Sequence, residues 1–310
     1  MARLGRGLAV VACVVLGLSG VARADWFDDA DAAHARGDYQ TEINILKPRA
    51  EQGYATAQYN LGVMYYNGQG VAQDYKTAAK WYTLPAEQGL TKAQSNLGVM
   101  YQQGQGVAQD YKAAVKWYTL AAEQGSSLAQ YNLGLMYANG DGVAQDYKAA
   151  VRWYTLAAEQ GDADAQFNLG VMYRNGQGVA QDYKAAVKWY TLAAEQGRAS
   201  AQNNLGLMYD MGQGVAQDYK AAVKWFTLAA EQGLAQAQNN LGFMYGKGQG
   251  VAEDYVKAHM WYNIAAIDGS DKKAAPNRDA IAKQMTASQI ARAQELASKC
   301  VAQKFRNCGS

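Results

Sequence analysis

The chain has 310 residues, with 29 basic side chains (Lys and Arg) against 27 acidic ones and a formal net charge of +2. So balanced a composition predicts no basic surface of the kind that binds nucleic acid or an anionic membrane. This length would ordinarily suggest two domains. An internal repeat predicts one elongated body instead, because the core of a repeat protein grows along the array.

The amino terminus, residues 1–24, has the pattern of a cleaved secretory signal peptide. Arg3 and Arg6 precede an apolar run from Leu8 to Leu18, and the small residues in Ala22–Ala24 suit a signal peptidase. The run is shorter than the roughly 20 residues needed to span a bilayer, which disfavours a retained membrane helix. Cleavage would leave 26 basic and 27 acidic residues and no integral membrane segment.

The three cysteines give information on where in the cell the protein is located. Val10–Cys13 resembles a lipoprotein box, so lipid anchoring through Cys13 stays open as an alternative, although the apolar run continues past it. The other two, Cys300 and Cys308, lie close together near the carboxyl end. In an oxidising compartment such a pair can form one disulfide, and two free thiols are the alternative.

Most of the chain is one unit repeated six times. Six tryptophans stand 36 residues apart, namely Trp81, Trp117, Trp153, Trp189, Trp225 and Trp261. Six units of 36 residues therefore fill residues 54–269. A fixed period in this range predicts a solenoid in which each unit covers its neighbour.

Each unit has the pattern of two helices joined by a loop, so we predict an all-α fold. In the first unit, Leu61 and Met64 follow helical spacing, and Gly68 stands where a left-handed residue would end the first helix. Asp74 is placed to cap the second helix, whose apolar face includes Trp81.

A glycine recurs inside every first helix, at Gly62 and its five copies, where it costs about 1 kcal/mol relative to alanine. It predicts a close approach to the backbone, and we expect the second helix with its tryptophan to make that approach. Pro85 stands in a second helix where the other units carry alanine, and it predicts a kink or an early end.

The two ends of the array depart from the repeat. Residues 25–53 align as a degenerate capping repeat, with Ile45 where the later units have tryptophan. Residues 270–310 predict a helical cap formed by two helices, Asn277–Gln284 and Ala287–Lys304. Atypical ends are expected because the outer face of a terminal repeat meets water.

The consensus of the units resembles the Sel1-like repeat, a relative of the tetratricopeptide repeat. The resemblance rests on AQ-x-NLG-x-MY, then G-x-GV-x-x-DY-x-x-A, then W-[YF]-x-x-AA-x-x-G, and it covers about seventy per cent of the chain. It implies a right-handed α-solenoid of helix pairs that serves as an adaptor in signalling, envelope assembly, polysaccharide systems or host contact. It implies no single activity.

Few residues suggest catalysis or metal binding. Ser270 and Lys273 match the S-x-x-K of serine β-lactamases, but no K-T-G accompanies them, and we interpret the match as coincidence. The two histidines, His34 and His259, lie near opposite ends of the chain and cannot form a metal cluster, and His259 replaces valine at a packing position. We therefore expect no catalytic residue, no metal and no cofactor.

Positions that differ among the units indicate where a partner would bind. One holds Tyr59, Ser95, Tyr131, Phe167, Asn203 and Asn239, and another holds Tyr66, Gln102, Ala138, Arg174, Asp210 and Gly246. Both positions share one face of the first helix. If the first helices line the inner curve, as in similar repeats, this face forms a concave groove. The groove would be aromatic at Tyr59, Tyr131 and Phe167 and rich in amides at Asn203 and Asn239, with Tyr66 and Arg174 as further contacts. Exposed aromatic side chains on a rigid surface suit an extended protein or peptide segment.

An asparagine follows the first variable position in every unit, as Asn60, Asn96, Asn132, Asn168, Asn204 and Asn240. Its amide can hydrogen-bond the backbone of a bound peptide, which makes Asn132 and Asn168 candidate binding residues. Alternatively, each asparagine links its own hairpin to the next one. The sequence leaves both interpretations open.

These patterns predict an exported, non-enzymatic scaffold that binds a protein or peptide, most simply in a bacterial periplasm. Two other hypotheses stay open, a hydrolase of the β-lactamase or penicillin-binding type and a secreted factor that binds a host protein. Neither the partner nor the oligomeric state follows from the sequence.

Overall fold

The structure is a computed structural model that describes residues 21–267, 269–306 and 308, with side chains from Trp26 onward. The predicted signal peptide lies outside the described residues, except that residues 21–24 open the first helix; Cys13 is also outside them. No helix in the described part is both long enough and apolar enough to cross a membrane. The described residues contain sixteen α-helices and no strand, which confirms the predicted all-α class.

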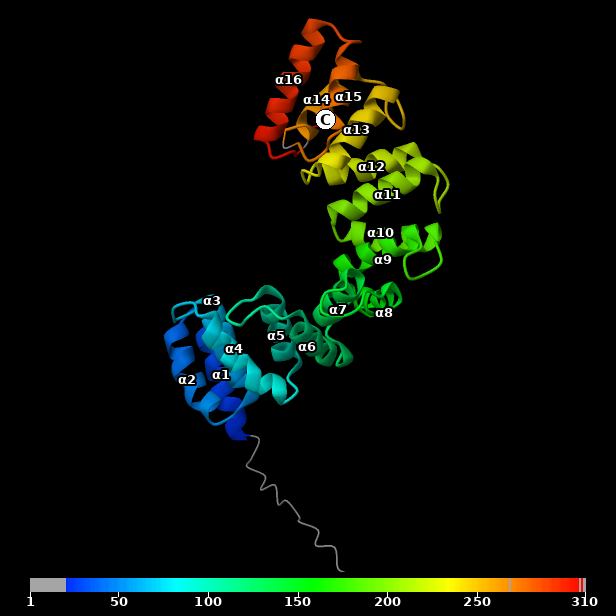
Figure 1. Ribbon diagram of the computed structural model, residues 1–310. Helices are drawn as coiled ribbons and strands as arrows, with labels where there is room; N and C mark the ends of the chain where they lie inside the picture. Colours follow the sequence, from blue (N-terminus) through cyan, green and yellow to red (C-terminus); the bar gives the residue numbers. More distant parts are fainter. Residues whose placement is uncertain (1–20, 268, 307, 309–310) are drawn as a thin grey trace, which may run out of the picture. The chain divides into compact units, whose positions relative to one another are not determined.

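The helices follow one another as antiparallel pairs (Figure 1). In chain order they are α1 (Val21–Ala35), α2 (Tyr39–Glu51), α3 (Ala55–Asn67), α4 (Tyr75–Glu87), α5 (Thr91–Gln103), α6 (Tyr111–Glu123), α7 (Ser127–Asn139), α8 (Tyr147–Glu159), α9 (Ala163–Asn175), α10 (Tyr183–Glu195), α11 (Ala199–Met211), α12 (Tyr219–Ala230), α13 (Ala235–Lys247), α14 (Tyr255–Ala265), α15 (Ala274–Ala282) and α16 (Ala287–Ala302).

The described chain forms two compact units, and the division passes through α5. The first unit runs to Ala93 and includes residues 105–108, while the second comprises residues 94–104 and everything from Gln109 onward. In the first unit α1 packs on α2, with Trp26 and Ala30 joining Leu46 and Leu61 in one buried cluster. The leading segment therefore packs on the first full repeat, and its assignment as a degenerate capping repeat stays a prediction.

Local signals set the ends of the helices. Ser126 caps α7 by accepting the Ala129 N–H, and Gly140 ends it with a φ of 82°. Asp146 then caps α8 by accepting the N–H groups of Lys148 and Ala149. Such caps satisfy backbone groups that a helix end leaves unpaired, so each repeat folds into the same hairpin.

The recurring glycine is approached by a tyrosine, and our expectation of a tryptophan was wrong. A Cβ added to Gly134 of α7 would lie 2.7 Å from ring carbons of Tyr154 in α8. Tyr154 is buried, whereas Trp153 is only half-buried and packs towards the preceding repeat. Adjacent helix positions point in directions about 100° apart, so the two rings serve different neighbours.

Buried clusters join the second helix of one repeat to the first helix of the next. Between α6 and α7, for example, Tyr118 and Ala121 pack with Leu133 and Met136. The alanines let the helices approach closely, and no repeat encloses such a core by itself. This continuity across repeats is what defines a solenoid.

A ladder of glutamines also connects the repeats of the second unit. Gln160 at the end of α8 donates from Nε2 to Gln130 Oε1 at 2.7 Å, and Gln130 Nε2 donates to the carbonyl oxygen of Ala122 at 3.1 Å. The same chain recurs one repeat later through Gln196, Gln166 and Ala158. Each buried amide therefore binds the preceding second helix as well as its own hairpin.

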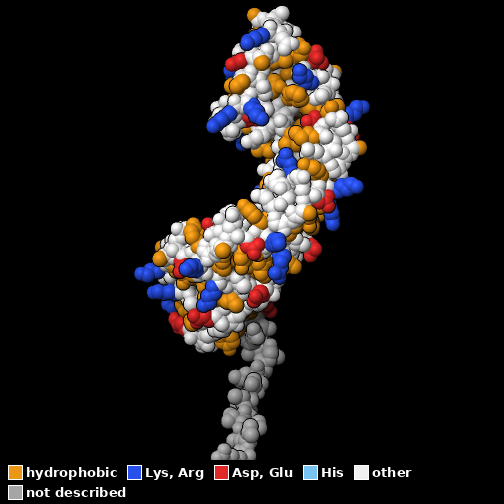
Figure 2. Space-filling model, turned by 45° about the vertical axis from the view of Figure 1, so that its right-hand side comes forward, with side chains coloured by type: hydrophobic (Ala, Val, Ile, Leu, Met, Phe, Trp, Pro, Cys, Tyr) orange, Lys and Arg blue, Asp and Glu red, His pale blue; other side chains and the backbone are white. Residues whose placement is uncertain are grey.

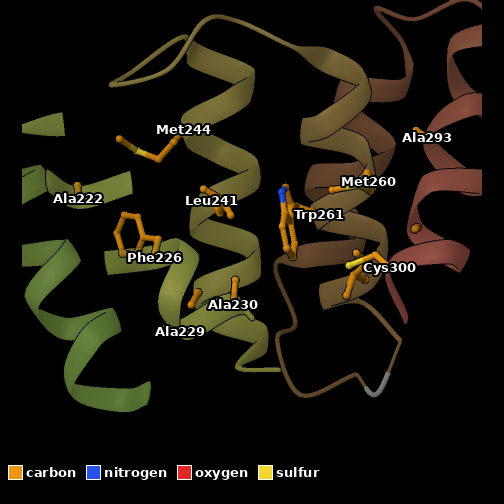
Figure 3. Close-up of a cluster of buried hydrophobic side chains, with 13 residues drawn as sticks. Ala222, Phe226, Ala229, Ala230, Leu241, Met244, Met260, Trp261, Ala293 and Cys300 are labelled. Atoms are coloured by element: carbon orange, nitrogen blue, oxygen red, sulfur yellow. The ribbon is translucent and has the colours of Figure 1, made fainter. Parts of the chain in front are cut away.

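The carboxyl end covers the last repeat (Figure 3). Helix α16 packs on α14, where Met260, Trp261 and Ile264 join Ala297 and Cys300 in one buried cluster. Trp261 is fully buried, unlike the half-buried tryptophans of the earlier repeats. The two predicted terminal helices are present, with α15 beginning three residues earlier than expected.

Two further details concern the ends of elements. A disulfide joins Cys300 at the end of α16 to Cys308. Pro85 does not end α4 early, so that part of the expectation was wrong, and a kink stays a prediction. Pro85 lies in the last turn of α4, where its missing N–H removes only one hydrogen bond before the helix ends at Glu87.

Replacing Gly134 by alanine should lower the stability of the protein although alanine is the better helix former. The added Cβ has to displace the Tyr154 ring, which should cost about 1 to 3 kcal/mol. Gly246 in α13 is the matched control, because its nearest neighbours would lie 3.6 Å from an added Cβ. Gly246→Ala should raise stability by up to about 1 kcal/mol. Urea unfolding followed by circular dichroism measures both; equal effects would contradict the steric explanation.

Candidate functional site

The structure places the predicted partner-binding residues in two groups. Tyr59 and Tyr66 belong to the first unit; Tyr131, Asn132, Phe167, Asn168, Arg174, Asn203 and Asn239 belong to the second. All are half-buried except Asn203 and Asn239, which are 8% and 7% exposed. The half-buried members of the second group form what we call the first-helix face.

Asn203 and Asn239 are not available as groove amides, which corrects their assignment as partner-binding residues. Asn203 Oδ1 accepts a hydrogen bond of 2.9 Å from Asn240 Nδ2, and Asn239 Oδ1 accepts one of 2.9 Å from Asn277 Nδ2. The first pair joins α11 to α13 and the second joins α13 to α15, so the amides serve the packing of one helix pair on the next.

The recurring asparagine also contacts a neighbouring repeat in the middle of the array, at Asn168. The Asn168 side chain faces the phenols of Tyr131 and Tyr154 in the preceding repeat. Burial raises the pKa of both phenols, and Asn168 acts in the opposite direction. Together with Asn240, this contact supports the interpretation in which each asparagine links its repeat to a neighbour.

Tyr131 and Phe167 form the aromatic part of the first-helix face. Their rings pack on Tyr154 and Tyr190, with centroids 6.0 Å apart in each pair. The Arg198 guanidinium lies over the Phe167 ring at 4.6 Å from the centroid and pairs with Asp164. The rings are therefore held from behind and from one side, which leaves rigid aromatic edges at the surface. Sequence reasoning missed Arg198, because it stands at a helix cap outside the variable positions.

Arg174 lies further along α9 on the same face. It is half-buried, and no carboxylate of the described residues pairs with it. Its guanidinium lies against the phenol of Tyr190, which is fully buried in α10. Sequence reasoning treated the tyrosine after each tryptophan as a packing residue and missed that its hydroxyl meets the side chain at the second variable position.

The first unit contains a separate pocket of about 240 Å³ lined by Tyr59, Asn60, His34 and Glu42, among others. His34 Nδ1 lies 2.9 Å from Glu42 Oε2, and the Glu42 side chain is buried. The pocket was not foreseen, because His34 and Glu42 come from the degenerate repeat.

The residues considered above for catalysis or metal binding lie on the exposed surface or in the packed core. Ser270 and Lys273 are exposed, and the backbone N–H of Lys273 donates to Asp271. His259 is buried at its packing position, where burial chiefly lowers its pKa and Arg278 adds to the effect. The described residues include no group of three or more His, Cys, Asp or Glu side chains that could hold a metal ion.

Positive and negative side chains are interspersed on the visible face of the molecule (Figure 2).

The described fold defines an α-solenoid of helix-turn-helix repeats with a helical cap at each end. The Sel1 repeat model matches six consecutive segments, residues 55–90, 91–126, 127–162, 163–197, 199–234 and 235–270. The chain belongs to the Sel1 repeat family, whose members generally act as scaffolds for protein–protein interaction.

The chain is also similar to proteins of solved structure. A Sel1 repeat protein from Oxalobacter formigenes is 33% identical, with a TM-score of 0.69 over 80% of this chain and 99% of that one. A protective antigen present in uropathogenic Escherichia coli strains is 27% identical, covering 92% and 95% of the two chains with a TM-score of 0.40. A putative Sel1 repeat protein from Klebsiella pneumoniae is 25% identical, covering 66% and 99% with a TM-score of 0.42. No curated protein matches the chain.

The hydrogen bond between Asn240 and Asn203 should stabilise the array. Asn203→Ala leaves the Asn240 donor without its acceptor and should cost about 1 to 3 kcal/mol. In a double-mutant cycle, Asn203→Ala and Asn240→Ala should show a coupling of at least about 0.5 kcal/mol in urea unfolding. Additive losses would mean that the two amides do not support each other.

Proposed function

We propose that this chain is a non-enzymatic scaffold of the bacterial envelope that binds a protein or peptide along its first-helix face. The observation that carries the proposal is the pair of aromatic side chains, Tyr131 and Phe167, held rigidly one repeat apart. Each ring is supported from behind by a tyrosine of the second helix. A preordered aromatic side chain loses little entropy on binding, which is why such residues often dominate binding energy.

The repeat itself separates this face from the parts that only build the fold. Leu133, Gly134 and Tyr154 recur because they pack the hairpin. Tyr131, in contrast, occupies a position that also accepts serine and asparagine in the same chain. A position that accepts such different side chains has no single packing role, and the half-buried rings of Tyr131 and Phe167 are available there for recognition.

The envelope location rests on the amino-terminal pattern and on the cysteines. Residues 1–24 have the charge and apolar run of a secretory signal. The disulfide between Cys300 and Cys308 needs an oxidising compartment to persist. Both features suit the periplasm; secretion to the outside and lipid anchoring are the alternatives.

Replacing both aromatic residues by asparagine should abolish partner binding without unfolding the protein. Asparagine stands at the same position at Asn203, so Tyr131→Asn with Phe167→Asn keeps a side chain that the repeat accepts. The wild type, immobilised, should capture a defined protein or peptide from the envelope fraction of its own organism. The double variant should lose it while keeping its helicity and its melting temperature within a few degrees.

The matched control removes two apolar side chains from the second helices. Leu156 and Leu192 are 43% and 37% exposed, and the variant Leu156→Ala with Leu192→Ala should capture the same partner as the wild type. Equal recovery by all three forms would show that the first-helix face is not the binding surface.

Export predicts a specific mature protein. Material purified from the envelope should begin at Asp25 by amino-terminal sequencing. Its cysteines should resist alkylation until a reductant is added, because Cys300 and Cys308 are bridged. An intact Met1, or two thiols that alkylate without reduction, would contradict export to the periplasm. A mature chain that begins with a lipidated Cys13 would support anchoring instead.

A further inference from the structure

The hydroxyl of Tyr190 is a buried polar group that the fold does not satisfy. Tyr190 is 0% exposed, and its oxygen has no hydrogen-bond partner among the described residues. The equivalent Tyr118, two repeats earlier, donates to Gln102 Oε1 at 2.7 Å. A buried hydroxyl without a partner is unfavourable, since water can no longer hydrogen-bond to it.

The side chain that faces this hydroxyl explains the difference. Arg174 occupies in its repeat the position of Gln102, the residue that accepts the bond from Tyr118. A glutamine carries an acceptor oxygen, whereas a guanidinium carries only donors. Arg174 therefore cannot accept the Tyr190 proton and can only donate towards the hydroxyl oxygen.

Two neighbours complete the surroundings of this space. Burial raises the pKa of the Tyr190 phenol, while the facing side chains of Asn204 and Arg174 act against it. The Phe167 ring lies beside Tyr190 on the same helix face as Arg174. Asp210, the residue at the Arg174 position of the next repeat, makes no ion pair with Arg174. Among the described residues no carboxylate pairs with Arg174, so its charge is not balanced by the chain at this point.

We propose that Arg174, Tyr190 and Asn204 form a subsite for a carboxylate of the bound peptide. A carboxylate is the acceptor that fits, because its two oxygens can pair with the planar guanidinium and still accept from a hydroxyl. Phe167 offers an apolar contact to the residue next to that carboxylate. The inference rests on the proposed binding function and adds the chemistry of the ligand.

The carboxylate can come from the carboxyl terminus of a peptide or from an Asp or Glu side chain. Four pools of random octapeptides distinguish the sources: a free carboxyl terminus with internal glutamate, a free terminus with glutamine, an amidated terminus with glutamate, and an amidated terminus with glutamine. Bead-bound pools are incubated with the fluorescently labelled full-length mature protein. We expect roughly tenfold stronger capture by at least one carboxylate-bearing pool than by the amidated glutamine pool.

The repeats supply the test variants. Arg174→Ala places at this position the residue that Ala138 contributes in the preceding repeat, and it should abolish the preference for carboxylate. Tyr190→Phe copies Phe226 of the next repeat and removes only the hydroxyl. It should reduce the preference and leave the melting temperature unchanged or higher, because the lost group has no partner. Tyr118→Phe, which removes a hydrogen bond that is present, should lower the melting temperature. Arg152→Ala removes an exposed cation from a second helix and should retain the preference.

Each outcome decides the proposal. Capture of all four pools alike, or a preference that survives Arg174→Ala, would overturn the subsite and leave binding along Tyr131 and Phe167 intact. A fall in melting temperature for Tyr190→Phe as large as for Tyr118→Phe would show a satisfied hydroxyl and would also overturn it. If the wild type captures none of the pools but still captures its partner from the envelope fraction, the subsite is wrong and the proposed function stands.

Discussion

The contact between a glycine of the first helix and an aromatic ring of the second determines the geometry of every repeat. At Gly134 the missing side chain lets the Tyr154 ring lie where a Cβ would otherwise be. The two helices then approach closely, and the alanines around them fill the remaining space. A glycine inside a helix is costly by itself, so the packing of the ring has to offset that cost in each repeat.

The same contact brings the tip of the ring to the first-helix face. What the hydroxyl meets there differs among the repeats: Gln102 accepts from Tyr118, whereas Arg174 leaves Tyr190 without an acceptor. In the fifth repeat Phe226 has no hydroxyl at all. One constant packing interaction therefore places a variable chemical group beneath the face where we propose that a partner binds. This arrangement lets a repeat protein change its binding chemistry without altering its fold.

The ends show how the array stops. On the second helices, Lys224 and its counterparts are exposed, but Met260 replaces that lysine in α14 and lies buried beneath α16. Trp261 becomes fully buried for the same reason. The disulfide at Cys308 holds the last residues of the described chain next to α16. At this position an apolar residue thus replaces the exposed lysine where a further helix covers it.

The sequence by itself determined the period, the helix pairs, their caps and the capped ends, because these depend on turn residues and on apolar spacing within a few positions. It also identified Tyr131, Phe167 and Arg174 as variable positions on one helix face. Tertiary structure alone decided that tyrosine rather than tryptophan meets the glycine, that Asn203 and Asn239 are used in packing, and that the Tyr190 hydroxyl lacks an acceptor. Those outcomes depend on the directions of side chains from helices that adjoin only after folding, and a linear pattern does not encode which of two neighbouring rings turns inward.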